Sequence, residues 1–120
     1  NLAWLLAVRG GDRASEALSL IQQAIGLEGE LPGLLDTRAL AYLAAGQTDP
    51  AIRDLEDSLV VAPLPDTYFH LARAYHAKGQ ARDAQDAFRR AQDLGLTVEG
   101  LHPLERPAFQ EIAAALVNPH

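Results

Sequence analysis

Apolar residues recur at helical spacing along most of the chain, and the helical stretches come in pairs. The first pair begins with an apolar stretch at residues 2–8, which Gly10 and Gly11 interrupt, so that a helix is expected to end near Arg9. In the second stretch the apolar positions follow one face of an α-helix: Ala17, Leu18, Ile21, Ala24 and Ile25. This pattern predicts a helical hairpin at the start of the chain.

The same scheme returns twice. Helices are predicted over residues 34–46, 49–61, 65–79 and 81–94, again as two pairs. Gly46 and Gly79 are expected to close the first helix of each pair with a positive φ. Asp49, followed by Pro50, and Asp66 are expected to cap the helices that start beside them. Three helical hairpins therefore follow one another.

The pattern changes after Gly95. Prolines stand at positions 103 and 107, and an apolar stripe follows: Leu104, Ala108, Ile112, Ala115 and Leu116. This predicts an irregular turn and one final helix from near Leu104. Such a helix can cover the last apolar face of a stacked array.

The hairpins repeat at a nearly constant period. Ala17, Ala51 and Ala84 are separated by 34 and 33 residues, and Ala-Tyr-x-Ala-x-Gly-Gln occurs at 41–47 and again at 74–80. Small alanines let neighbouring helices approach closely, and tyrosines fill the space between hairpins. A period of 33 or 34 residues with two helices in each unit is typical of few repeat architectures.

The third unit matches one such pattern best, W-x₂-L-G-x₂-Y…A-x₃-F. Its matching positions are Tyr68, Leu71, Ala72, Tyr75, Ala84 and Phe88. Over about residues 1–96 the sequence resembles the tetratricopeptide repeat family. The resemblance implies an all-α fold: an α-solenoid of stacked antiparallel helical hairpins, a TPR-like superhelix, with a capping helix at its C-terminal end.

The expected organisation is one domain. Residues 1–96 form three hairpins, the first of them truncated at its N-terminus, and residues 97–120 form the irregular turn and the capping helix. The chain starts without a methionine and inside an apolar pattern. We therefore expect it to be a fragment of a larger protein.

Arg38 departs from the repeat pattern, because it stands where a buried leucine is expected. We expect its stem to lie along apolar surface, or its guanidinium to pair with a carboxylate, rather than to act on a ligand. On this interpretation Arg38→Leu keeps or raises the melting temperature. The acidic residues Asp54, Glu56 and Asp57 are expected on a solvated helix face.

Composition excludes several functions. The net charge of −6 disfavours nucleic acid, the longest apolar runs are too short to span a membrane, and there is no cysteine. His70 and His76 are about 240° apart around a helix, so they cannot bind one metal ion together and are expected at the surface. No catalytic motif is present, so we expect neither an enzyme nor a cofactor.

The resemblance implies where a ligand would bind. First helices of tetratricopeptide hairpins line a concave groove that holds extended peptides or partner helices. The residues expected to face such a groove are Asn1, Trp4, Asp36, Thr37, Leu40, Leu43, Phe69, His70, Arg73 and His76. Trp4 and Phe69 beside Arg73 have the composition of a binding hot spot. For Trp4, cover by a missing N-terminal part of the helix is an equally good interpretation.

We therefore expect a protein-interaction module, a scaffold that binds a protein or peptide. The alternative is a structural spacer or a self-association segment of a longer solenoid, with no ligand of its own. Self-association is expected to be weak at most.

Overall fold

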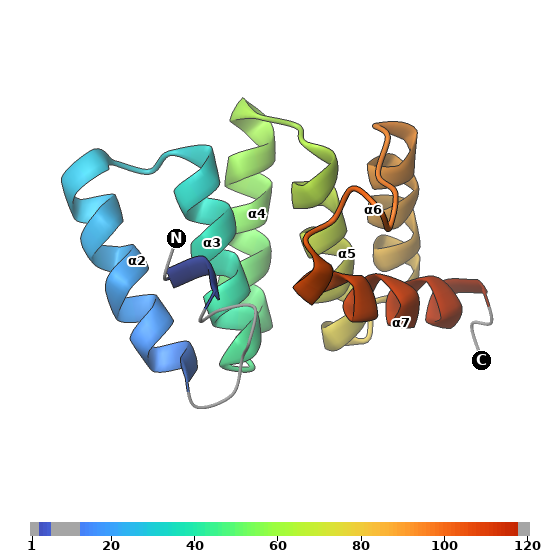
Figure 1. The fold of residues 1–120 in the computed structure, drawn as a ribbon, viewed down its shortest axis with the longest axis horizontal. Coiled ribbons are helices and arrows are strands. Elements are labelled where there is room, and N and C mark those ends of the chain that lie inside the picture. The colour runs from blue at the N-terminus through green and yellow to red at the C-terminus, as the bar shows by residue number, and fades with distance from the viewer. Residues whose placement is uncertain (1–2, 6–12, 118–120) are drawn as a thin grey trace.

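The computed structural model describes residues 3–5 and 13–117, and its regular structure is helical throughout (Figure 1). Residues 3–5 form a helical turn. The helices that follow are α2 (Ala14–Glu28), α3 (Pro32–Ala44), α4 (Thr48–Val61), α5 (Pro65–Lys78), α6 (Ala81–Asp93) and α7 (Arg106–Val117), with the 3₁₀ turn η2 (Pro103–Glu105) before α7. Consecutive helices from α2 to α6 pack against one another as antiparallel neighbours. The predicted all-α stack of hairpins is confirmed, and the predicted end of the first helix near Arg9 lies outside the described residues.

The glycines that end α3 and α5 explain the repeated Tyr-x₃-Gly-Gln. Gly46 and Gly79 have φ values of 77° and 85°, as predicted. Beyond the glycine, the Gln47 N–H donates to the carbonyl of Tyr42 at 2.8 Å, and the Gln80 N–H donates to that of Tyr75 at 2.9 Å. These bonds close the Schellman motif, in which only glycine adopts the left-handed conformation without strain.

The predicted N-caps are wrong. Helix α4 begins at Thr48 after Gln47, α5 begins at Pro65 after Leu64, and neither helix has a side-chain cap bond. Pro65 takes the first helical position, where its fixed φ is favourable, so Asp66 is already inside the helix. Asp49 instead pairs with Lys78 Nζ at 2.7 Å.

Alanines lie at the closest approaches between helices. The alanines at the repeat positions are 0% exposed: Ala17, Ala39, Ala51, Ala72 and Ala84. A larger side chain at these positions would hold the helices apart, which is why the repeat keeps alanine there. The main core joins α3 to α7, and a smaller cluster around Ala17, Leu40 and Ala41 joins α2 to α3.

Helix α7 is placed differently from the other helices. It crosses α5 and α6, whereas α3 lies along α2 and α5 along α4 (Figure 1). Ile112 is buried, and the Phe109 ring lies 5.4 Å from that of Phe88. The last helix thus covers one end of the stack, as its apolar stripe predicts.

Candidate binding pocket on the first-helix face

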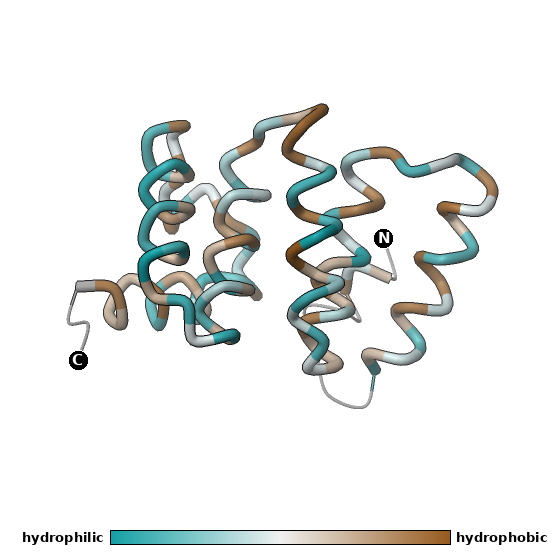
Figure 2. The backbone as a smooth tube through the Cα atoms, turned by 180° about the vertical axis from the view of Figure 1, so that it is seen from behind, coloured by the Kyte–Doolittle hydropathy of each residue, from teal (hydrophilic) through white to brown (hydrophobic). Residues whose placement is uncertain are grey.

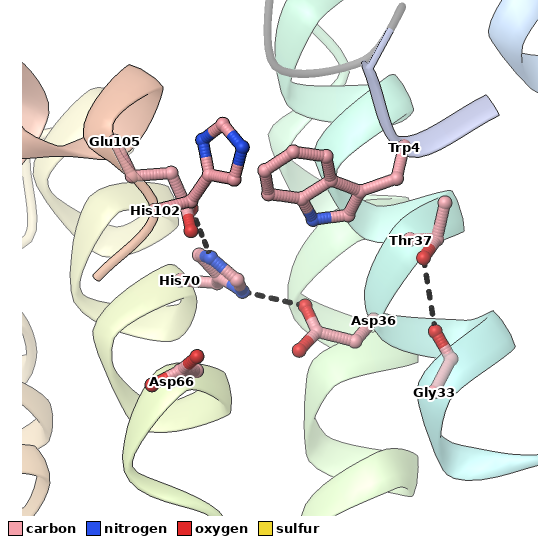
Figure 3. A pocket seen from close by; sticks show the side chains of 8 residues that line it. All are labelled: Trp4, Gly33, Asp36, Thr37, Asp66, His70, His102 and Glu105. Carbon is pink, nitrogen blue, oxygen red and sulfur yellow. Dashed lines mark hydrogen bonds and ion pairs between the residues drawn. The ribbon is translucent and has the colours of Figure 1, made fainter. Parts of the chain in front are cut away.

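A pocket of about 400 Å³ lies on the first-helix face, the side of α3 and α5 that carries Asp36 and His70 (Figure 3). Residues from both ends of the chain complete it. Its lining residues are Trp4, Gly33, Asp36, Thr37, Asp66, His70, His102 and Glu105. The pocket therefore depends on segments that are far apart in the sequence.

His70 lies between two carboxylates at the floor of this pocket. Its Nδ1 is 2.6 Å from Asp36 Oδ1 on α3, and its Nε2 is 2.5 Å from Glu105 Oε1 on η2. The Thr67 hydroxyl donates to the second oxygen of Asp36 at 3.0 Å. His70 thus connects the second hairpin, the third hairpin and the segment before α7.

The imidazole of His70 is held in its charged form. Burial alone would lower its pKa, but the charges and hydrogen bonds of Asp36 and Glu105 outweigh burial and raise the pKa to about 10. At neutral pH both ring nitrogens carry protons and donate to the carboxylates. Because the imidazolium is fully occupied in this way, it cannot act as a general base.

Two further charges lie next to this network. Arg73 Nη1 is 3.8 Å from Glu105 Oε1, and burial lowers the Arg73 pKa against the opposing effect of Glu105. The Asp66 carboxylate makes no hydrogen bond or ion pair with another side chain among the described residues. Burial raises the Asp66 pKa, His70 opposes that shift, and Glu105 and Asp36 add to it. The pocket is lined by three carboxylates and one imidazolium, which favours a cationic ligand.

Aromatic rings form the rim of the pocket. The Trp4 and His102 rings are 4.8 Å apart at an angle of 65°, one edge toward the other, above the His70–Asp36 pair (Figure 3). Trp4 is half-buried against the cluster of α2 and α3. An edge-to-face contact of this kind is worth about 0.5–1.5 kcal/mol.

The structure brings four of the predicted groove residues to the pocket: Trp4, Asp36, Thr37 and His70. Thr37 is buried and donates to the Gly33 carbonyl at 3.0 Å, so its hydroxyl is already used. His76 is exposed and Arg73 is half-buried. Asn1 lies outside the described residues.

Exposure was predicted wrongly for several of these residues. Phe69 is 0% exposed because the Phe88 and Phe109 rings pack against it, and Leu40 is buried in the cluster of Ala17 and Trp4. Leu43 is half-buried against the core. His70 is buried by its two carboxylates rather than lying at the surface. Neighbouring helices and the last segment cover positions that are open on an isolated hairpin.

Arg38 pairs with a carboxylate, as expected. Its Nε and Nη2 donate to the two carboxylate oxygens of Asp54, both at 2.7 Å, and this hydrogen bonding raises the Arg38 pKa. Asp54 is 5% exposed, so its predicted solvated position is wrong. Arg38→Leu is therefore expected to lower the melting temperature instead of keeping it, because that change leaves Asp54 buried without its partner.

Sequence reasoning missed Glu105 and the role of His102. Neither belongs to a repeat position, and Glu105 bonds to a histidine 35 residues earlier. A signal did exist for Asp54. Arg38 and Asp54 both depart from the apolar residues found 33 positions later, Leu71 and Ala87, and a charge at each of two facing positions indicates an ion pair.

Within residues 3–5 and 13–117 no helix has the length and apolar character needed to cross a membrane. The same part of the chain holds no group of three or more histidine, aspartate or glutamate side chains arranged to bind a metal ion.

The arrangement defines an α-helical repeat solenoid. More narrowly, the chain has the fold of a tetratricopeptide-repeat domain. It is similar to the crystal structure of the Sgt2 TPR domain from Aspergillus fumigatus, with a TM-score of 0.70 and 23% sequence identity over 88% of this chain and 70% of that one. Neither a protein-family model nor a curated protein sequence matches the chain.

Proposed function

We propose that this chain is a protein-interaction module that binds an extended peptide or a helix of a partner protein on its first-helix face. The observation that supports this most is the pocket of about 400 Å³ between α3, α5 and the two end segments. Three carboxylates and the Trp4 ring line it, so a lysine or arginine side chain is the ligand group it suits. A preformed pocket of this kind holds a segment at low entropic cost.

Trp4 fluorescence tests this proposal, because Trp4 is the chain's one tryptophan and lies at the pocket rim. The probe is a set of lysine- and arginine-rich peptides selected from a displayed library, each titrated beside its counterpart with glutamate at those positions. We expect saturable binding of the basic peptides, weakened about tenfold or more by Asp66→Asn. Selection of no peptide whose affinity falls on Asp66→Asn would overturn the proposal.

One observation favours the alternative of self-association. Hydrophobic residues lie along one edge, where α2, α4 and α6 end (Figure 2), and several of them have exposed side chains. This apolar edge comprises Leu27, Val60, Val61, Leu64 and Leu94. Sedimentation over a concentration series tests it: self-association that Val61→Lys abolishes supports this alternative, and a monomer at every concentration excludes it.

A further inference from the structure

The chain's own last segment covers part of the first-helix face. Phe69 has the same place in the third hairpin as Asp36 in the second, 33 residues earlier, yet Asp36 borders the pocket and Phe69 is buried. The difference comes from α7, whose Phe109 ring lies 5.9 Å from that of Phe69. On the third hairpin, η2 and α7 therefore occupy surface that a ligand would otherwise contact.

Three side chains of this segment make the contact. Glu105 reaches His70 and Arg73, Phe109 packs between Phe69 and Phe88, and Ile112 is buried in the core. The three stand four and three residues apart, the spacing of one helix face. Amphipathic helices bind protein grooves with anchors at this spacing.

The remaining contacts of α7 are weaker. Beyond its apolar stripe, the one side-chain hydrogen bond from the hairpins to α7 among the described residues is from Gln85 Nε2 to the Leu116 carbonyl, at 3.5 Å. Ala108, Ala113 and Leu116 are only half-buried. An element with few buried contacts opens locally at a lower free energy than the core it covers.

Opening of α7 would uncover a surface with a definite chemistry. Phe69 and Phe88 would supply two aromatic faces, and His70 and Arg73 would supply cationic groups beside them. Loss of Glu105 would leave both cations without that carboxylate. Such a surface suits an acidic and aromatic helix, and not a basic one.

We propose that the surface beneath α7, formed by Phe69, His70, Arg73 and Phe88, is a binding site for an amphipathic helix of a partner protein. The partner helix carries a carboxylate, an aromatic ring four residues later and an aliphatic side chain three residues after that. Helix α7 fills the site until the partner displaces it. The partner can bind only those molecules in which α7 is open. Its apparent affinity is therefore the intrinsic affinity multiplied by the open fraction.

The test uses the full chain and a fluorescently labelled peptide with the sequence of residues 101–117. In one chain variant, Phe109→Ala and Ile112→Ala together loosen α7. We expect this variant to bind the peptide about tenfold more tightly than the unaltered chain does, measured by fluorescence anisotropy. A peptide that carries Phe109→Ala is expected to lose that binding.

Matched variants separate this site from general loosening. Leu104→Ala removes an exposed side chain within η2 and is expected to leave the chain's peptide affinity unchanged. In the loosened chain, Arg73→Gln is expected to lower the affinity for the unaltered peptide. It is not expected to lower the affinity for a peptide that carries Glu105→Gln, because Arg73 and Glu105 act as a pair. Equal effects on both peptides would contradict the pairing.

The experiment with the loosened chain gives a clear result even if that variant unfolds. In that case the peptide must restore its helical circular dichroism and raise its melting temperature as peptide concentration increases. A peptide that neither binds the loosened chain nor restores its fold overturns the proposal. An unaltered chain that sediments as a dimer, and that the peptide converts to a monomer, overturns the partner assignment and makes a second copy the occupant.

This proposal does not rest on the pocket function. The peptide test depends on substitutions of Phe109 and Arg73. The pocket test depends on the fluorescence of Trp4 and on a substitution of Asp66. Asp66→Asn is expected to change the affinity of the 101–117 peptide less than about twofold. Either proposal can therefore fail without the other.

Discussion

The second and third hairpins have the same backbone arrangement, but different side-chain contacts join their two helices. In the second, α3–α4, Arg38 forms two hydrogen bonds to Asp54. In the third, α5–α6, the residues 33 positions later are Leu71 and Ala87, which are buried without charge. The same place in the fold thus accepts an ion pair or an apolar contact. What it does not tolerate is half of an ion pair, because a lone buried charge is costly.

The first-helix face gives the same lesson. Leu40 in α3 is buried against Ala17 and Trp4, whereas Arg73, its equivalent in α5, is half-buried beside Glu105. Each residue matches the neighbour that the tertiary structure places opposite it. Hence the repeat preserves the stack, and the positions between the repeated residues adapt to local partners.

Removing the charge of His70 is expected to have the largest effect. His70→Gln leaves Asp36 and Glu105 without their shared cation, and we expect a loss of about 3–5 kcal/mol of unfolding free energy. Urea denaturation measures it, with the exposed His76→Gln in the same helix as control. Similar losses for the two variants would contradict the role of His70 as the centre of the network.

The pH dependence of stability tests the same group. The folded pKa of about 10 lies above the unfolded value of 6.5, so the stabilisation is complete below pH 6.5 and is lost as the pH rises through 10. Between pH 7 and 9 the unfolding free energy should fall by about 1 kcal/mol per pH unit, and His70→Gln should abolish that slope. If the slope persists in His70→Gln, another titratable group causes the pH dependence.

The Arg38–Asp54 pair is expected to show the next largest effect. Arg38→Leu alone should lower the unfolding free energy by about 2–4 kcal/mol, because Asp54 stays buried without a partner. Arg38→Leu with Asp54→Ala copies the third hairpin and should fall within about 1 kcal/mol of the unaltered chain. If the double variant is as unstable as the single one, the two hairpins are not interchangeable at this place.

The turns should behave alike in both hairpins. Gly46→Ala and Gly79→Ala force a Cβ into the left-handed conformation and should each cost about 1–2 kcal/mol. Gly26→Ala is the control, since Gly26 lies within α2 with open space around it and should gain about 0.5–1 kcal/mol. A clear difference between the two turn variants would show that the repeated motif does not have the same role twice.

The exposed pair Asp49–Lys78 should show the smallest effect. It also joins neighbouring hairpins, at 2.7 Å, but both side chains are in water. Lys78→Ala should leave the melting temperature unchanged within error. A loss comparable to that of Arg38→Leu would show that burial is not what separates the strong pairs from the weak one.

Sequence reasoning was most successful where the cause is local. The positive φ of Gly46 and Gly79 follows from glycine's missing Cβ, and the order of the helices follows from proline, glycine and the apolar period, although several predicted starts are wrong. It was least successful for the pocket. Trp4, Asp36, Thr37 and His70 were expected on one face and do line it, but Glu105 was not foreseen.

Over residues 14–117 the sequence by itself determined the order and stacking of the helices, because alanine, tyrosine and glycine act through contacts that repeat every 33 or 34 residues. Only the tertiary structure decided which polar side chains are buried and what covers them. His70 forms a hydrogen bond with Glu105, which lies 35 residues later in the sequence. Phe69 packs against Phe109 because α7 crosses α5. Such pairs depend on where the last helix docks, which no local period encodes.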